Sequence, residues 1–215
     1  MKIQDNSKLI FIGDSISDFE RARPCGEGLF GGIGKSYVGL VDGLLRTTYP
    51  ASHIRVINMG TSGNTTRDLK ARWQTDVLDL HPDWLGILIG INDTWRRYDS
   101  NLPMTVEEYE ANYRRLVQDV KENTKAKLLL LEPFLLHADP AKECFREDLD
   151  PKILAARRVA RDYADMFLPL DGLLAAASVI EEPSHWSGDG VHPNEAGSRL
   201  IGRYYAEAFA AMLGK

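Results

Sequence analysis

The residue types that could carry out nucleophilic catalysis lie near the two ends of the chain. Gly13-Asp14-Ser15 directly follows an apolar run, and Asp189-Gly190-Val191-His192-Pro193 lies near the C-terminus. An aspartate three residues before a histidine can fold back to bond its Nδ1, which leaves Nε2 free to act as a base toward a serine. Two structural alternatives stay open: a strand-to-helix turn with a helix cap, and an Asx-type turn before the last helix.

Two further turns could bind a developing oxyanion. Gly90-Ile91-Asn92-Asp93 ends an apolar run, and the asparagine amide would donate a hydrogen bond without adding a charge. The segment 60–65 ends another run, and a glycine such as Gly63 lets backbone N–H groups approach a ligand closely. Each of these motifs alone is also consistent with ordinary turn chemistry.

Taken together, the four motifs resemble the SGNH (GDSL) hydrolase family. Its four signature residues match Ser15, Gly63, Asn92 and His192, and Asp189 completes the triad. The match extends from the first predicted strand to the last helix. Within the family, the chain is similar to intracellular acetylxylan esterases; the supporting strings are Arg21–Pro24 with Gly26–Gly28, Asp68–Trp73, Asn92–Asp99, and Trp186 three residues before the triad aspartate.

This resemblance implies a serine esterase that removes short acyl groups, above all acetyl, from sugar hydroxyls through an acyl-enzyme. Ser15 would attack the ester carbonyl, His192 would take its proton, and Asp189 would orient the imidazole. The N–H groups of Ser15 and Gly63 and the amide of Asn92 would hold the oxyanion. Neither a cofactor nor a metal is expected. The candidate substrate contacts are Asp14, Arg21, Trp95 and Trp186.

Three other functions remain open at this point. A thioesterase or lysophospholipase of the same family would need a long acyl slot, and a carbohydrate-binding protein could keep the fold without catalysis. A nucleotide-binding protein is suggested by Gly26–Gly31, which fits the dinucleotide fingerprint letter for letter. That motif follows Arg23-Pro24 instead of a strand, and no acidic residue ends the second predicted strand, so we interpret it as a flexible loop beside the site.

The elements that must position these residues are predicted from hydrophobic patterning. Near-continuous apolar runs favour parallel strands covered on both faces, and apolar residues at helical spacing separate them. The alternation predicts an α/β fold, a three-layer α/β/α sandwich of flavodoxin-like type around a five-stranded parallel sheet, with residues 1–215 as a single domain. The predicted strands are Lys8–Ile12, Arg55–Asn58, Leu85–Ile89, Lys127–Leu131 and Phe167–Leu170.

Irregular segments follow these strands, at 13–34, 59–64, 90–103 and 132–149. In an open α/β sheet such segments gather at the carboxyl ends of the strands, where ligands bind. The last helix is predicted to run from about Pro193 to Leu213. We therefore expect the catalytic residues to meet at one end of the sheet.

Composition restricts the partners and the compartment. The 215 residues include 26 Lys and Arg against 31 Asp and Glu, a formal net charge of −5, which argues against nucleic-acid and membrane partners. The apolar run 9–12 is too short for a signal-peptide core, and Cys25 and Cys144 cannot build a disulfide framework. We expect a cytoplasmic protein with free thiols and a small acylated sugar as its substrate. The resemblance is compatible with a homo-oligomer.

Overall fold

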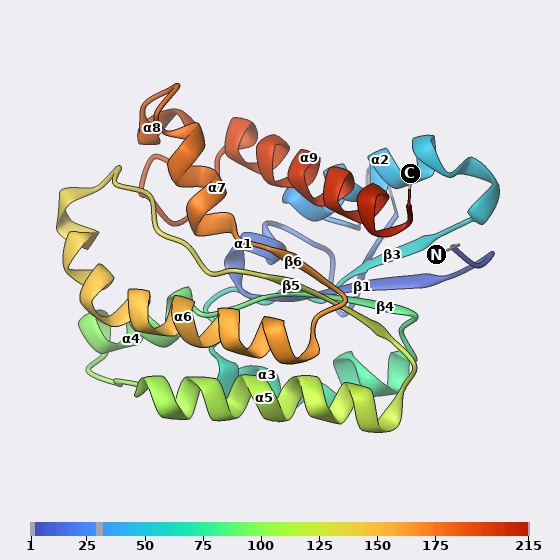
Figure 1. Ribbon diagram of the computed structural model, residues 1–215, viewed down its shortest axis with the longest axis horizontal. Helices are drawn as coiled ribbons and strands as arrows, with labels where there is room; N and C mark the ends of the chain where they lie inside the picture. The colour runs from blue at the N-terminus through green and yellow to red at the C-terminus, as the bar shows by residue number, and fades with distance from the viewer. Residues whose placement is uncertain (1–2, 29–31, 215) are drawn as a thin grey trace.

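One mixed sheet forms the centre of the computed structural model, which describes residues 3–28 and 32–214 (Figure 1). Its strands lie in the order β2-β3-β1-β4-β5-β6. The five predicted strands are present and parallel; their bounds are β1 Lys8–Gly13, β3 Arg55–Asn58, β4 Trp84–Leu88, β5 Lys127–Leu131 and β6 Met166–Leu168.

The prediction of a five-stranded sheet was wrong by one strand. A two-residue strand, β2 (Gly26–Glu27), pairs antiparallel with the outer edge of β3, with Gly26 opposite Asn58. The segment expected to be a flexible loop beside the site therefore begins as an edge strand. Leu29, Phe30 and Gly31 of the same motif lie outside the described residues.

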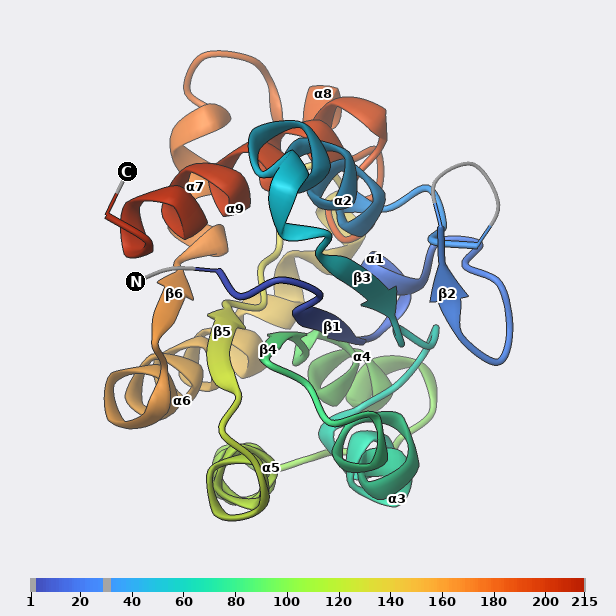
Figure 2. The same cartoon turned by 90° about the vertical axis from the view of Figure 1, so that its right-hand side faces the viewer.

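Helices connect the strands and cover both faces of the sheet. Figure 2 shows α2, α7 and α9 on one side and α3, α5 and α6 on the other. The bounds are α1 Ser15–Asp18, α2 Tyr37–Thr48, α3 Thr66–Asp76, α4 Ile91–Asp99, α5 Val106–Asn123, α6 Arg146–Tyr163, α7 Leu170–Ala177, α8 Pro183–Trp186 and α9 Glu195–Met212, with 3-10 turns at Pro50–Ser52, Leu78–Leu80 and Pro140–Phe145.

Strand β1 shows why the sheet is covered on both faces. Successive side chains of a strand point to opposite faces, so a strand buried on both sides must be apolar throughout. Leu9 and Phe11 belong to the core cluster that includes α2 and α9, whereas Ile10 and Ile12 belong to the cluster with α3 and α5. All four side chains are fully buried.

Side-chain caps fix where several helices begin. Ser36 accepts a hydrogen bond from the N–H of Val38 at the start of α2, and Asn194 accepts one from the N–H of Gly197 at the start of α9. These caps satisfy N–H groups that have no partner within the helix. The last helix thus begins after Asn194, two residues later than predicted, and Pro193 lies outside it.

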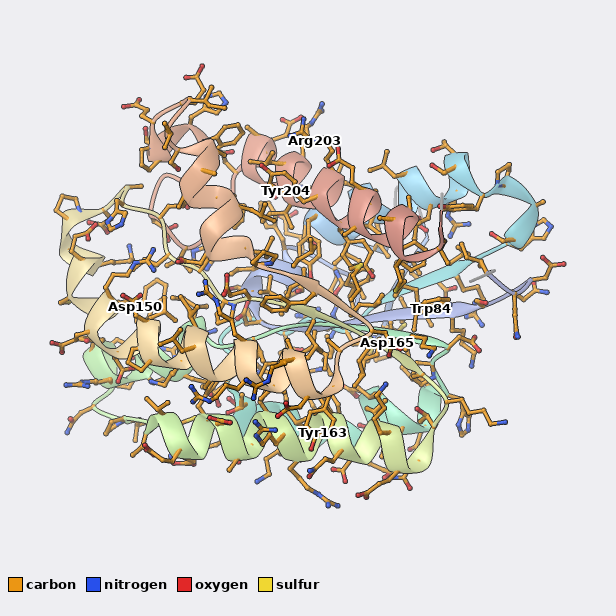
Figure 3. The ribbon with its side chains drawn as sticks, in the orientation of Figure 1. Trp84, Asp150, Tyr163, Asp165, Arg203 and Tyr204 are labelled. Carbon is orange, nitrogen blue, oxygen red and sulfur yellow. The ribbon has the colours of Figure 1, made fainter. Side chains whose placement is uncertain are left out.

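The segments after β1, β3, β4 and β5 lie at one end of the sheet, as predicted. In Figure 1, α1, α4 and α8 lie at the end opposite to the chain termini. In Figure 3, Trp84 and Asp165 mark the amino ends of β4 and β6, and they lie toward the side of the chain termini. Asp150 of α6 lies at the opposite end. Within the described ranges, no helix is long and apolar enough to cross a membrane.

Candidate active site

Ser15 is the first residue of α1, immediately after β1. Asp14 caps this short helix, because its Oδ1 accepts a hydrogen bond of 2.9 Å from the N–H of Ile16. The strand ends at Gly13, where a Cβ atom would lie 2.1 Å from the carbonyl oxygen of Leu88. A glycine is therefore required for β1 to approach β4 and turn directly into the helix that presents Ser15.

His192 and Asp189 lie on the loop before α9, and they reach Ser15 across the end of the sheet. The Oγ of Ser15 lies 2.9 Å from Nε2 of His192, and Nδ1 of His192 lies 2.8 Å from Oδ2 of Asp189. The other carboxylate oxygen, Oδ1, accepts the backbone N–H groups of Val191 and His192 at 3.0 and 2.7 Å. The loop thus fixes the aspartate from its own backbone, and the aspartate fixes the imidazole.

Electrostatics matches this geometry. The hydrogen bond that Nδ1 of His192 donates to Asp189 raises the pKa of His192, although partial burial opposes the effect. Hydrogen bonds from His192 and two backbone N–H groups hold the pKa of Asp189 well below its usual range, against the effect of burial. The pair is therefore arranged to stabilise a histidine that has gained a proton.

Asn92 and Gly63 are linked through two neighbours, Asn64 and Arg96. The Nδ2 of Asn92 donates to the carbonyl of Asn64 at 3.2 Å, and its Oδ1 accepts a hydrogen bond of 3.3 Å from Nη2 of Arg96. Gly63 has a φ of 81°, a left-handed conformation that favours glycine. A Cβ on Gly63 would lie 3.8 Å from that same Arg96 nitrogen.

The segment that carries Asn92 differs from the prediction. Residues 90–103 were expected to be irregular, but Ile91–Asp99 form the helix α4. Gly90, with a φ of 142°, makes the sharp change from β4 into this helix. Asn92 consequently lies in the first turn of a helix, where only 4% of its surface is exposed.

Two buried carboxyl groups lie behind the site. Asp14 and Asp93 are each 1% exposed, and one oxygen of each, Oδ2, has no hydrogen-bond partner among the described residues. Burial raises the pKa of Asp14 to about 7 and that of Asp93 to about 6. Asp93 accepts hydrogen bonds from the N–H and the hydroxyl of Thr66, which ties α4 to α3.

The four candidate substrate contacts differ in their surroundings. Asp14 is buried beneath Ser15 as the cap of α1, and Arg21, 6% exposed, donates to the carbonyls of Gly60 and Pro24. These two side chains hold the loops together and leave little surface for a ligand. Trp95 is half-buried with its ring centroid 6.0 Å from that of His192.

Trp186, the fourth candidate, is half-buried on α8 and packs edge-on against His185. Its carbonyl accepts the N–H of Asn194, so α8 contacts the cap of α9. By contrast Trp73 and Trp84 are core residues, with 3% and 5% of their surface exposed. Of the two tryptophan candidates, Trp95 is the one whose ring lies near His192.

Lys142 was not singled out from the sequence. It lies in the 3-10 turn 140–145, and its Nζ is 4.0 Å from Oδ2 of Asp189 and 5.3 Å from the ring centroid of Trp95. An ion pair with Asp139 at 2.6 Å holds it there. No motif surrounds this lysine, so only the fold could reveal that a cation stands beside the Asp189 carboxylate.

Potential metal ligands do not cluster in the part of the chain that the structure describes. Among residues 3–28 and 32–214, no group of three or more His, Cys, Asp or Glu side chains could hold a metal ion. Cys25 and Cys144 are free thiols.

A model of the GDSL-like lipase/acylhydrolase family matches residues 11–200, which contain all of these site residues. The chain belongs to this family. A relative within it is an acetylxylan esterase from Geobacillus stearothermophilus, 42% identical over 211 residues that cover 95% of this chain and 94% of the relative. The family resemblance inferred from the motifs is therefore confirmed.

Solved structures of GDSL-like acylhydrolases agree with the fold. The crystal structure of Axe2, an acetylxylan esterase from Geobacillus stearothermophilus, has a TM-score of 0.87 and 40% identity, covering 100% of this chain and 97% of Axe2. An R55A mutant described as an acetyl-xylooligosaccharide esterase has a TM-score of 0.88 and 39% identity, covering 97% and 96%. Three catalytic mutants of Axe2 replace a serine, an aspartate and a histidine by alanine.

Proposed function

We propose that this protein is a serine esterase that removes acetyl groups from short acetylated xylo-oligosaccharides. The observation that carries the proposal is the continuous hydrogen-bonded row from Ser15 through His192 to Asp189, with spacings of 2.9 and 2.8 Å. The relation to Axe2 over nearly the full length of both chains supports the choice of acetylated xylose chains as substrate.

In this mechanism the Oγ of Ser15 forms a bond to the carbonyl carbon of the acetyl ester while its proton moves to Nε2 of His192. Asp189 stabilises the imidazolium that results. The carbonyl oxygen becomes an oxyanion, which the N–H groups of Ser15 and Gly63 and the amide of Asn92 would stabilise.

The intermediate then collapses and the bond to the sugar oxygen breaks. His192 gives its proton to that oxygen, the deacetylated sugar leaves, and the acetyl group stays on Ser15. Water next attacks the acetyl-serine with His192 again as base. Acetate leaves and the proton returns to the Oγ of Ser15.

The catalytic mutants of Axe2 support these roles by their positions. The serine variant of Axe2 is at position 15, as is Ser15 here, and the aspartate and histidine variants lie three positions apart, as do Asp189 and His192. The proposal follows the same residue types in the same order along the chain.

Replacement of the nucleophile tests this function. Ser15→Ala should abolish release of acetate from acetylated xylotriose and hydrolysis of p-nitrophenyl acetate, whereas Ser184→Ala, an exposed serine on α8, should retain both. In the wild type, a sulfonyl fluoride should label Ser15, as detected by mass spectrometry of the peptide. Activity retained in Ser15→Ala would overturn the proposal.

A further inference from the structure

Two adjoining hollows form a groove that begins at Ser15 and runs between α1, α2 and α9. The hollow at Ser15 has a volume of about 280 Å³ and is lined by Ser15, His192 and Phe19 among others. A larger hollow of about 640 Å³ follows, at the N-terminal ends of α2 and α9. Phe19 and Ser198 line both hollows, so the two are contiguous, and we call them together the α2–α9 groove.

Phe19 stands where the two hollows meet, with 42% of its surface exposed. Its φ of 23° is uncommon for a residue other than glycine, and such a conformation persists only where the surroundings enforce it. Here its N–H donates to the carbonyl of Ser15, and its own carbonyl accepts the N–H of Lys35. The backbone thus holds the aromatic ring of Phe19 partly exposed to solvent, one helical turn from Ser15.

The lining of the groove combines an apolar floor with charged edges. Ile33 and Leu40 continue the apolar surface from Phe19. One edge carries the ion pair of Lys35 with Glu20 and the other that of Arg199 with Glu195, each at 2.6 Å. These four charged side chains are at least 61% exposed, so they can turn toward a ligand. A sugar ring, with apolar faces and a rim of hydroxyl groups, matches such a surface.

The position of His192 decides which part of the substrate the groove would take. Nε2 must reach the oxygen of the leaving alcohol to return its proton, so the leaving sugar lies on the His192 side of Ser15. His192 and Pro193 line the hollow at Ser15, which opens into the larger hollow of the groove. Gly63 and Arg96 line a separate hollow on the side of the oxyanion donors.

We propose that the α2–α9 groove binds the sugar residues that extend beyond the acetylated one, with Phe19 as their stacking platform. This inference rests on the proposed esterase function and names the surface that would hold the rest of the xylo-oligosaccharide. The larger hollow of the groove, about 640 Å³, lies within the roughly 300–1,000 Å³ typical of ligand sites.

Chain-length dependence tests the proposal. We would measure kcat/KM for acetylated xylose, acetylated xylotriose and p-nitrophenyl acetate, and report each sugar relative to p-nitrophenyl acetate. In the wild type this ratio should be larger for the triose than for the monosaccharide. Phe19→Ala should lower the ratio for the triose about tenfold, since an aromatic contact contributes roughly 0.5–1.5 kcal/mol beyond the area it buries.

Leu44→Ala is the matched control, because Leu44 is 40% exposed on α2 and does not line the groove. It should leave the ratio unchanged. Arg199→Ala, on the surface of α9, provides a second groove variant that does not disturb packing and should lower the ratio two- to threefold. Thermal unfolding of each variant would establish that it is folded.

Three results would overturn the assignment in distinguishable ways. If the triose ratio were equal in the wild type and in Phe19→Ala, the groove assignment would be overturned and the proposed esterase function would stand. A selective loss with p-nitrophenyl octanoate in Phe19→Ala, at an unchanged triose ratio, would assign the groove to an acyl tail. No cleavage of acetylated xylotriose by the wild type, with p-nitrophenyl acetate still hydrolysed, would overturn the proposed function and the groove assignment with it.

Discussion

Nη2 of Arg96 lies 3.3 Å from Oδ1 of Asn92, one turn earlier on α4. Because the amide oxygen faces the guanidinium, the amide nitrogen must face the other way, where one of its two N–H groups donates to Asn64. An ion pair with Asp99 holds Arg96 in turn. The amide that would stabilise the oxyanion is therefore oriented by a neighbour with a fixed charge.

A double-mutant cycle tests this relationship. Asn92→Ala should lower kcat by roughly 10²–10³ with little change in KM. Arg96→Met should lower kcat about tenfold in the wild type, the order expected for loss of one charged hydrogen bond. In the Asn92→Ala background it should have no further effect. Multiplicative losses would show that Arg96 does not act through Asn92, and an undiminished kcat in Asn92→Ala would remove the amide from the oxyanion site.

Replacement of Asp189 by asparagine should act on both rate and pH dependence. The loss of kcat should approach 10⁴-fold, because an amide does not hold the required tautomer of His192. Catalysis needs neutral His192, whose pKa Asp189 raises, so activity falls as the pH drops through that raised value. Without the carboxylate, the acidic limb of kcat/KM should move to lower pH. Asp162→Asn, which affects a surface ion pair with Arg114, should leave the limb in place.

Lys142→Met should move the same limb in the opposite direction. The cation lies 4.0 Å from Asp189 and lowers the pKa of His192. Its removal should raise that pKa, so activity should begin to fall at a higher pH than in the wild type. Lys125→Met, at an exposed position after α5, is the control. An unchanged limb would show that Lys142 has no electrostatic influence on the histidine, and a shift to lower pH would contradict the predicted sign of that influence.

Asp14→Asn should change how stability depends on pH. The folded-state pKa of about 7 exceeds the unfolded value of roughly 4, so the folded chain binds more protons between these values and the wild type loses stability as the pH rises through them. Asparagine can keep the cap on α1 without that loss. The free energy of unfolding of Asp14→Asn minus that of the wild type should therefore increase from pH 4 to pH 8, by at most about 4 kcal/mol. Urea unfolding at both pH values measures this, and parallel curves would contradict it.

The sequence was informative where local pattern determines structure. Five strands were predicted because each is a continuous apolar run, and the proximity of Ser15, His192 and Asp189 because their motifs lie directly beside predicted elements. Strand β2 could not be predicted, since two residues carry no periodicity and Gly26 becomes a strand only by pairing with Asn58. Helix α4 was missed because Gly90 and Asn92 are equally typical of a turn.

The motifs also could not predict which side chains are buried or which distant segments come into contact. The sequence places Asp14 beside Ser15, but only the packing of β1 against its neighbours shows that the carboxyl group is enclosed. Lys142 approaches Asp189 from a segment that is 47 residues away in sequence, and nothing in its neighbourhood marks it. Such contacts depend on tertiary structure alone.

The aspartate and the histidine come from one loop of four residues, whereas the serine is 177 positions away in the chain. Local chain geometry thus brings the proposed acid and base together, whereas the 2.9 Å contact between Ser15 and His192 depends on how the loop before α9 packs against the end of β1. A small movement between these two segments would separate the Oγ of Ser15 from His192, while the contact between His192 and Asp189 stayed intact. On heating, activity should therefore be lost at a lower temperature than the one at which the protein unfolds.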